Sequence, residues 1–300
     1  MTKTLLFGGS GFFGPVILSI GPVILSKDPN IISVGRTKPP SHCQNKHIQI
    51  NNLDELNKLD SIEFDNVIFL IGSSNHHDIN INIDMGIDFN VYPLNKALDY
   101  FSKKNLKKFI CFTTILLYDQ KKIVIPVDET QEINPFANKY IFSKYLSEQI
   151  VKFYQSKVPS IIVRLSNIYG YTELRRPDLI PTIMQDVFEK EKVEIWSNKP
   201  KRDFIFTEDA ADAVLRLLET DFTGILNLGS GKMSSLKLIS EIIEDLSGKK
   251  IVSKDKAVSG PMEFNTNIKK ISEITGWEPK FDIKKGLEKT FDIMRSYYSK

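Results

Sequence analysis

Cysteine, histidine and tryptophan are scarce in this 300-residue chain, which has two cysteines, four histidines and two tryptophans. Cys43 and Cys111 are far apart in sequence, so they form neither a disulfide framework nor the ligand spacing of a zinc site. We therefore expect a reducing, cytoplasmic location and no bound metal. His76 and His77 are adjacent, followed by Asp78, and this spacing does not place metal ligands on one helix face, so we predict a loop there.

The chain also lacks a large excess of charge of one sign, because the formal net charge is only +3. A balance this close to neutral argues against nucleic acid and against an anionic membrane as partners. The most basic local stretch, "KKNLKK" at residues 103–108, is interpreted as a solvated helix end. The composition, 41% hydrophobic and 26% charged, is that of a globular protein with an ample core.

The chain has a single long uncharged run, from Thr4 to Ser26. Its length is that of a membrane anchor, and the preceding lysine imitates a signal peptide. Five glycines and two prolines interrupt the run, however, and would break up an isolated helix in lipid. A strand, a glycine loop and a helix account for the same residues better, so we expect no membrane segment.

A short internal repeat, "GPVILS", occurs at residues 14–19 and again at residues 21–26. The seven-residue offset is close to two helical turns, so both copies would present their apolar side chains on one face. We interpret it as a local duplication that lengthens the first helix or bulges out after it. Pro22 is unfavourable inside a helix, which predicts a break or kink near Ile20 and Gly21.

Apolar runs of strand length alternate with helical patterns over the first half of the chain. The runs are residues 4–7, 31–35, 47–50, 66–72, 107–114 and 160–165, and long helices are predicted at 88–103 and 135–155. This alternation predicts an α/β fold with a doubly wound parallel sheet of the Rossmann type. We assign residues 1–170 to a dinucleotide-binding domain, to which 203–228 return, and residues 171–202 and 229–300 to a smaller substrate-binding lobe.

A glycine pattern follows the first strand directly, with Gly8, Gly11 and Gly14 spaced three apart before a helix. Such glycines form a tight turn and let a pyrophosphate approach backbone N–H groups at a helix N-terminus. The second strand ends in Gly35 and Arg36, without the carboxylate that binds the ribose of NAD. Arg36 would instead pair with a 2′-phosphate, which favours NADP(H), unless it stacks on adenine or faces solvent.

Tyr140 and Lys144 are four residues apart in a predicted helix, so both side chains project from one face. A neighbouring ammonium favours the phenolate of tyrosine, which then serves as an acid or base near neutral pH. The fifth strand ends in Thr113 and Thr114, either of which could hydrogen-bond the same reacting oxygen.

Taken together, these segments resemble the extended short-chain dehydrogenase/reductases, in the NAD-dependent epimerase/dehydratase family that modifies nucleotide sugars. The resemblance covers nearly the whole chain. It rests on "FGGSGFFG", with Phe7 in place of a threonine, and on "NLDEL", "FICFTTILLYD", "NKYIFSKYLSEQIV", "VRLSNIYG", "KRDFIFTEDAADAV", "NLGSGK" and "GWEPKFDIKKGL".

The resemblance implies roles for individual residues. The implied catalytic residues are Thr114, Tyr140 and Lys144. The implied cofactor-binding residues are Gly8, Ser10, Gly11, Phe12, Phe13, Gly14, Arg36, Asn52, Leu53, Tyr140 and Lys144. The implied substrate-binding residues are Thr114, Asn167 and Arg202, of which Arg202 would hold the diphosphate of a nucleoside-diphosphate sugar. Arg164 matches the arginine that opens the "VRLSNIYG" motif. The resemblance also implies a homodimer paired through residues 88–103 and 135–155.

Departures from the family pattern limit the reactions that this chain could catalyse. A sugar 4,6-dehydratase has Asp-Glu after its catalytic Ser or Thr, where this chain has Ile115 and Leu116, which cannot transfer protons. Two outcomes remain: an NADP(H)-dependent 4-keto reductase, favoured by Arg36, and an NAD-dependent 4-epimerase. A dinucleotide sensor without chemistry is a distant third, because Thr114, Tyr140 and Lys144 are all retained.

Overall fold

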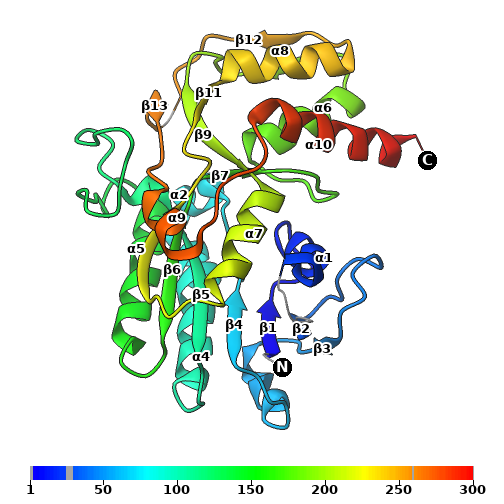
Figure 1. Cartoon of the computed structure of the whole chain (residues 1–300). Helices are drawn as coiled ribbons and strands as arrows, with labels where there is room; N and C mark the ends of the chain where they lie inside the picture. Colours follow the sequence, from blue (N-terminus) through cyan, green and yellow to red (C-terminus); the bar gives the residue numbers. More distant parts are fainter. Residues whose placement is uncertain (1–2, 25–29, 259, 300) are drawn as a thin grey trace.

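A parallel sheet of seven strands forms the centre of the computed structural model, which describes residues 3–24, 30–258 and 260–299 (Figure 1). The strands lie in the order β10-β6-β5-β4-β1-β2-β3. Their bounds are β1 Lys3–Phe7, β2 Asn30–Gly35, β3 His47–Gln49, β4 Asn66–Phe69, β5 Lys108–Thr114, β6 Ser160–Leu165 and β10 Gly224–Leu228. Chain order reverses between β1 and β4, which creates the crevice where such sheets bind ligands.

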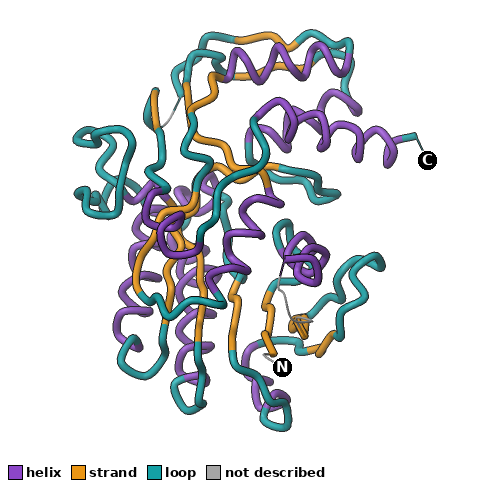
Figure 2. The backbone as a smooth tube through the Cα atoms, viewed as in Figure 1, coloured by secondary structure: helices purple, strands orange, loops and turns teal. Residues whose placement is uncertain are grey.

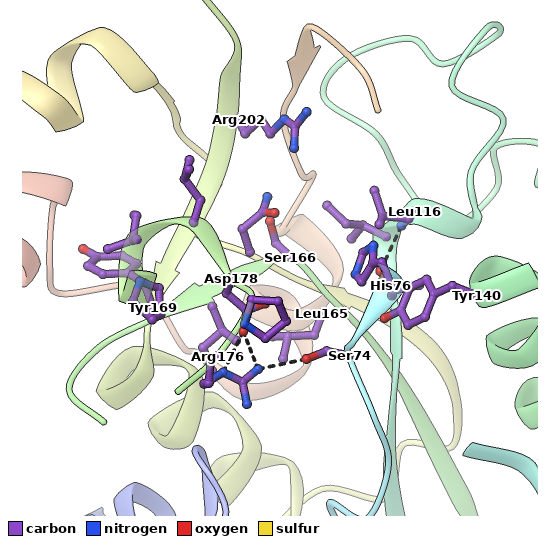
Figure 3. Close-up of a pocket in the computed structure, with 18 of the residues that line it drawn as sticks. Ser74, His76, Leu116, Tyr140, Leu165, Ser166, Tyr169, Arg176, Asp178 and Arg202 are labelled. Atoms are coloured by element: carbon purple, nitrogen blue, oxygen red, sulfur yellow. Dashed lines mark hydrogen bonds and ion pairs between the residues drawn. The ribbon is translucent and has the colours of Figure 1, made fainter. Parts of the chain in front are cut away.

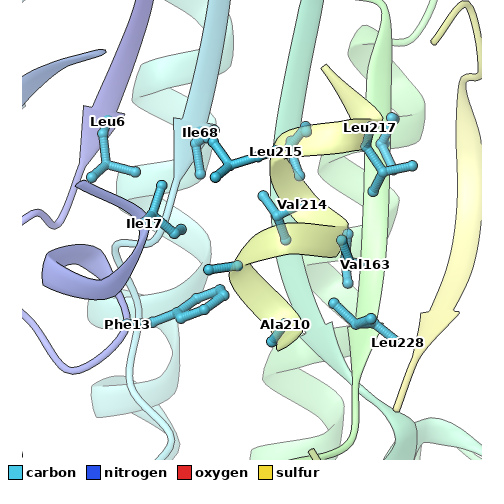
Figure 4. Close-up of a cluster of buried hydrophobic side chains, with 14 of the residues drawn as sticks. Leu6, Phe13, Ile17, Ile68, Val163, Ala210, Val214, Leu215, Leu217 and Leu228 are labelled. Carbon is cyan, nitrogen blue, oxygen red and sulfur yellow. The ribbon is translucent and has the colours of Figure 1, made fainter. Parts of the chain in front are cut away.

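The strands are apolar along their whole length because both faces of the sheet are buried. In β1, Leu6 points into one buried cluster, whereas Leu5 and Phe7 point into the cluster on the opposite face. Figure 4 shows the first cluster, in which Leu6 packs near Ile17 of the first helix. The predicted doubly wound α/β fold is confirmed.

Helices cover both faces of the sheet. The helices and helical turns are α1 Gly14–Ile24, η1 Leu53–Leu59, α2 His76–Ile81, α3 Ile83–Gly86, η2 Ile87–Val91, α4 Tyr92–Phe101, η3 Ile115–Leu117, α5 Lys139–Tyr154, α6 Leu179–Glu189, α7 Thr207–Leu217, α8 Leu236–Ser247, α9 Lys269–Thr275 and α10 Ile283–Tyr298. Helices α1, α7 and α9 contribute to one apolar cluster, and η1, α4 and α5 contribute to the other. Among the described helices, none combines the length and apolar character needed to cross a bilayer.

A smaller lobe lies beyond the carboxyl ends of the strands, whose direction the arrows of Figure 1 show; Figure 2 gives the same view as a tube. Its sheet combines β7 Asn167–Tyr169, β9 Lys201–Phe206, β11 Met233–Ser235 and β13 Glu263–Phe264, and β8 Val193–Ile195 pairs with β12 Ile251–Ser253. Helices α6, α8 and α10 share a third apolar cluster with these strands. Within residues 203–228, α7 and β10 pack in the main sheet assembly, whereas β9 belongs to the small sheet.

Three local predictions are corrected. Helix α1 continues through Ile20 and Gly21 to Ile24, so the predicted break there is wrong; Pro22 lies close to the described helix end, where its missing N–H removes a single hydrogen bond. Residues 25 and 26 of the repeat lie outside the described residues. The expected loop at His76 is instead the start of α2, because the Asn75 side chain accepts a hydrogen bond from the N–H of Asp78 and caps the helix.

The third correction concerns the basic stretch at residues 103–108. Lys108 is buried, and its ammonium donates a hydrogen bond to the carbonyl of Leu217 at 3.0 Å and another to Thr220. The residue opens β5 and ties it to the end of α7, so this end of the stretch is not solvated.

Candidate functional site

The glycine loop joins β1 to α1 at the carboxyl edge of the sheet. Gly8 has a φ of 88°, a left-handed conformation that favours glycine, and its carbonyl accepts a hydrogen bond from Gly11 N–H at 3.0 Å. A Cβ on Gly14 would lie 2.4 Å from the Gly8 oxygen and 2.6 Å from the Cα of Gly9. The loop can therefore close this tightly only if residue 14 lacks a side chain.

Two aromatic residues of the loop face different surroundings. Phe13 belongs to the apolar core and packs edge-on against Phe112, with ring centroids 5.8 Å apart. Only its backbone is in a position to meet a ligand. Phe12 lies under the guanidinium of Arg176, which is 4.4 Å from the ring centroid. Arg176 comes from the segment before α6, so this contact joins the glycine loop to the smaller lobe.

The neighbouring strands β2 and β3 end at the same edge of the sheet. Arg36 follows β2 directly and is exposed. Asn52 follows β3, and its side-chain oxygen accepts a hydrogen bond from Asp54 N–H at 2.7 Å, which caps η1. Leu53 begins that turn. These side chains lie at the edge predicted for the adenosine end of a dinucleotide.

Helix α5 positions the predicted acid/base residues. Asn138 caps the helix through a hydrogen bond from Ile141 N–H, which starts the helix just before Tyr140. The Lys144 ammonium lies 5.7 Å from the centroid of the Tyr140 ring. Thr114, at the end of β5, lines the same cavity as Tyr140 and is close enough to lower the pKa of its phenol. The three residues predicted from sequence are therefore brought together.

Burial shifts the ionisation of both titratable groups. The pKa of Tyr140 is raised, mainly by burial and further by Asp178, while Thr114 opposes the shift. Burial lowers the pKa of Lys144 to about 8. With a pKa of about 8, Lys144 is still mainly an ammonium at neutral pH. The raised pKa keeps the Tyr140 phenol protonated, and the nearby ammonium is the group that would stabilise its phenolate.

Asn90 completes this group and was not predicted. It lies buried on η2, inside the predicted helix 88–103, with no polar motif around it that could have indicated a role. Its side-chain oxygen accepts hydrogen bonds from Lys144 Nζ at 3.0 Å and from Ser73 N–H at 2.7 Å. Its amide nitrogen donates to Ser143 Oγ at 3.1 Å, so Asn90 fixes Lys144 against the loop after β4.

A cavity of about 660 Å³ opens beside Tyr140 (Figure 3). Four predicted site residues line it: Thr114, Tyr140, Asn167 and Arg202. Asn167 donates a hydrogen bond to the Asp203 carbonyl at 2.8 Å, which couples β7 to β9, the strand that carries Arg202. The volume suits a ligand of nucleotide-sugar size.

Two further groups in this cavity were also not predicted. The imidazole of His76 stacks on the ring of Tyr140, with centroids 3.9 Å apart. Arg176 donates hydrogen bonds to Asp178 at 2.6 Å and to Ser74 at 3.0 Å, so it bridges the loop after β4 and the smaller lobe (Figure 3). No sequence spacing indicates the His76–Tyr140 stack or the bond from Arg176 to Ser74, because these partners come from segments far apart in the chain.

Comparison with known proteins places the chain in a family. The sequence profile described as "NAD dependent epimerase/dehydratase family" matches residues 4–229. The chain belongs to this family. A Methanocaldococcus jannaschii protein provisionally named a UDP-glucose 4-epimerase is 25% identical over 97% of this chain and 98% of its own length.

Solved structures of the family have the same fold. The UDP-glucose 4-epimerase of Thermotoga maritima, solved with UDP-glucose, superimposes with a TM-score of 0.87, covering 99% of each chain at 20% identity. The UDP-glucuronic acid 4-epimerase of Bacillus cereus, solved with NAD, superimposes with a TM-score of 0.79 at 21% identity, covering 99% of this chain and 100% of its own. At these identities the likeness shows the fold alone.

The residues present fit the dinucleotide that the family name implies. Because Gly14 has no Cβ, the glycine loop can turn tightly into α1. No side chain of residue 14 then covers the backbone N–H groups at the start of α1, and pyrophosphate binding needs these groups to be accessible. The Lys144 ammonium is held by Asn90 beside Tyr140. The described residues include no group of three or more His, Cys, Asp or Glu side chains that could hold a metal ion.

Proposed function

We propose that this protein is a nucleotide-sugar 4-epimerase that uses a retained NAD. The observation that carries the proposal is the grouping of Thr114 and Tyr140 on one wall of the cavity that also holds Arg202. The relatives described above, whose names are those of UDP-sugar 4-epimerases, favour this reaction over the 4-keto reductase that Arg36 predicts. A UDP-sugar is therefore the substrate to test first.

Each residue has a chemical role in this proposal. When bound, NAD supplies the hydride acceptor for C4 and then the donor. Tyr140 removes the proton from the C4 hydroxyl and later returns it. Lys144 stabilises the phenolate that makes this possible, and Thr114 orients the reacting oxygen. Arg202 would pair with the diphosphate, which anchors the nucleotide while the sugar turns to present its other face.

Dehydration has no support at this site. Ile115 and Leu116 line the cavity directly after Thr114, and hydrocarbon side chains cannot protonate or deprotonate C5 and C6. A single hydride step at C4 remains. The opposite pattern, an acidic pair at these positions, would have favoured a 4,6-dehydratase.

A second candidate rests on Arg36. This exposed guanidinium at the end of β2 supports binding of a 2′-phosphate, and so an NADP(H)-dependent 4-keto reductase that releases its cofactor. The two reactions differ in whether added cofactor is needed.

The test is incubation of the purified protein with UDP-glucose, and then with CDP-, GDP- and dTDP-sugars, without added cofactor. Proton NMR reports inversion at C4 by the change in coupling of the ring protons. Inversion with full retention of deuterium from a C4-deuterated sugar supports the epimerase. The proposal fails if no sugar is inverted while a 4-keto sugar is reduced only when NADPH is added.

A further inference from the structure

His76 contacts the proposed acid/base residue directly. Its imidazole and the Tyr140 phenol are nearly parallel, with an interplanar angle of 16° and a centroid distance of 3.9 Å. This is a closer approach than the 4.5–7 Å usual for aromatic pairs. Both rings line the cavity, and Figure 3 shows them side by side.

The two rings are held by elements that are fastened to each other. The backbone N–H of Tyr140 donates to Asn80 Oδ1 of α2 at 3.0 Å. Lys139 Nζ donates to the carbonyl of Ile81 at 2.8 Å. Helix α2 and the first turn of α5 are therefore joined by two hydrogen bonds, and both stacked rings are carried by helices.

The start of α2 is itself pinned. Asn75 Nδ2 donates to Asp78 Oδ2 at 2.6 Å, and Asp78 N–H donates back to Asn75 Oδ1 at 3.2 Å. Asn75 N–H donates to Ser73 Oγ at 3.1 Å, which links the cap to the loop that also contacts Asn90. Together these contacts fix the backbone of His76 relative to the group around Lys144.

Partial desolvation favours the neutral form of the His76 ring. His76 is an exposed residue, but the protein around its ring removes part of the surrounding water, and this desolvation lowers its pKa. Lys144 of α5 and Arg202 of β9 lower that pKa further, and Asp178, before α6, opposes them. A neutral aromatic ring stacks on a phenol without adding a charge to it.

We infer that His76 is a positioning residue, whose stacked ring fixes the plane of the Tyr140 phenol and so aims its hydroxyl at the reacting oxygen beside Thr114. The inference rests on the proposed function for its kinetic consequence. Without the stack the phenol ring can turn about its Cβ–Cγ bond. This rotation leaves the oxygen in place but turns the O–H bond, which lies in the ring plane, away from the reacting oxygen. Misalignment of a reacting group lowers rates by up to about 100-fold.

The kinetic test compares three variants with the wild-type protein. His76→Ala is expected to lower kcat between about 10- and 100-fold with KM changed less than about threefold. His76→Phe keeps a flat ring and is expected to restore kcat to within about threefold. His42→Ala, an exposed histidine beyond β2, is the matched control and should match the wild type. Full kcat in His76→Ala, or a His76→Phe variant as slow as His76→Ala, would overturn the inference.

A second measurement does not need turnover. In protein with ring-labelled tyrosine, the Tyr140 signals are assigned by their loss in Tyr140→Phe. The inference expects separate signals for the two edges of the ring in the wild type and one averaged signal in His76→Ala. Averaged signals in both proteins would contradict it. Restricted ring motion in a protein that inverts no sugar would instead refute the proposed function and leave the positioning role intact.

Discussion

At the scale of single residues, the account depends on Tyr140 as a buried phenol between a hydroxyl and an ammonium. Replacement of Tyr140 by phenylalanine removes the proton carrier and leaves the ring. We expect Tyr140→Phe to lose between about 10²- and 10⁴-fold in turnover, with nucleotide affinity and melting temperature nearly unchanged. The control is Tyr100→Phe, whose hydroxyl bonds Asp60 far from the cavity. Turnover of Tyr140→Phe at the wild-type rate would contradict the assignment.

The lowered pKa of Lys144 leads to a separate prediction about the stability of the fold. Its pKa is about 8 in the folded protein against an ordinary value of 10.5, so the unfolded chain binds the proton more tightly between these pH values. Burial of the ammonium therefore lowers the free energy of unfolding by about 3 kcal/mol at pH 7, and this loss is relieved as pH rises from about 8 to 10.5.

Lys144→Met should remove that loss. Asn90 Oδ1 keeps its hydrogen bond from Ser73 N–H in this variant. Lys144→Met is expected to be inactive. In urea titrations its free energy of unfolding should be higher than that of the wild type at pH 7, and this difference should become smaller toward pH 10.5. A variant that is less stable than wild type at pH 7 would show that the ammonium is well compensated in the fold.

Sequence spacing predicted the reactive residues but not the groups that position them. The four-residue interval of Tyr140 and Lys144 projects both from one helix face whatever surrounds them. The end of an apolar strand predicted Thr113 or Thr114, and the family resemblance selected Thr114. His76 and Asn90 act through contacts between segments distant in the chain, and Lys108 is buried because an unrelated helix ends beside it. Such contacts follow from packing, which a local pattern does not contain.

At the scale of elements, helix α5 is fixed by a buried ion pair. Arg164 of β6 donates two hydrogen bonds to Glu148 of α5, each at 2.9 Å, and both side chains are buried. Thr113 Oγ1 of β5 donates to the same carboxylate at 2.9 Å. Glu148 lies one turn beyond Lys144 on α5. The Arg164–Glu148 pair therefore fixes the position of Tyr140 and Lys144 relative to the main sheet.

Breaking the pair should be costly. Arg164→Leu leaves the Glu148 carboxylate buried without its cation, which is expected to lower the free energy of unfolding by about 3–5 kcal/mol. The double variant with Glu148→Leu should lose less than Arg164→Leu alone. Asp99→Asn, in the exposed pair with Lys103, serves as control with an effect below about 1 kcal/mol. Denaturant titrations that give equal losses for the buried and the exposed pair would contradict this role.

The strands of the main sheet were predictable for a physical reason. A parallel strand buried on both faces reads as a continuous apolar run, and six of these runs were recognised within a few residues of their bounds. The small sheet was not predicted from the sequence, because strands such as β11 and β13 are short and form only by pairing with β9. Helix α2 was missed because its cap, Asn75, precedes a segment without apolar periodicity.

At the scale of the whole molecule, the cavity lies where the main sheet and the smaller lobe meet. Its lining combines Thr114 and Tyr140 from the sheet assembly with Arg176, Trp196 and Arg202 from the segments beyond β7. The division of the chain into two domains stays a prediction. In this arrangement the sheet edge carries the groups suited to a dinucleotide and to proton transfer, whereas the lobe carries cations suited to a diphosphate.

The predicted homodimer is testable on the outer face of η2, α4 and α5. Phe89, Tyr92 and Phe153 are exposed there, and Phe153 retains 79% of its accessible surface. A second copy of the chain paired through these helices would bury them. Phe153→Glu is expected to give a monomer by light scattering after gel filtration. Val124→Glu, a similarly exposed apolar site on a distant loop, should stay dimeric. A monomeric wild-type protein would contradict the predicted dimer.

The central claim is that the protein keeps NAD between turnovers, and the dinucleotide released by the denatured, freshly purified protein tests this most directly. Mass spectrometry should identify the released compound and its ratio to protein. The account predicts NAD in near-stoichiometric amount, with Arg36 stacked on the adenine or facing solvent. Recovery of NADP(H), or a site that fills with NADPH in preference to NADH, would contradict it and support the reductase.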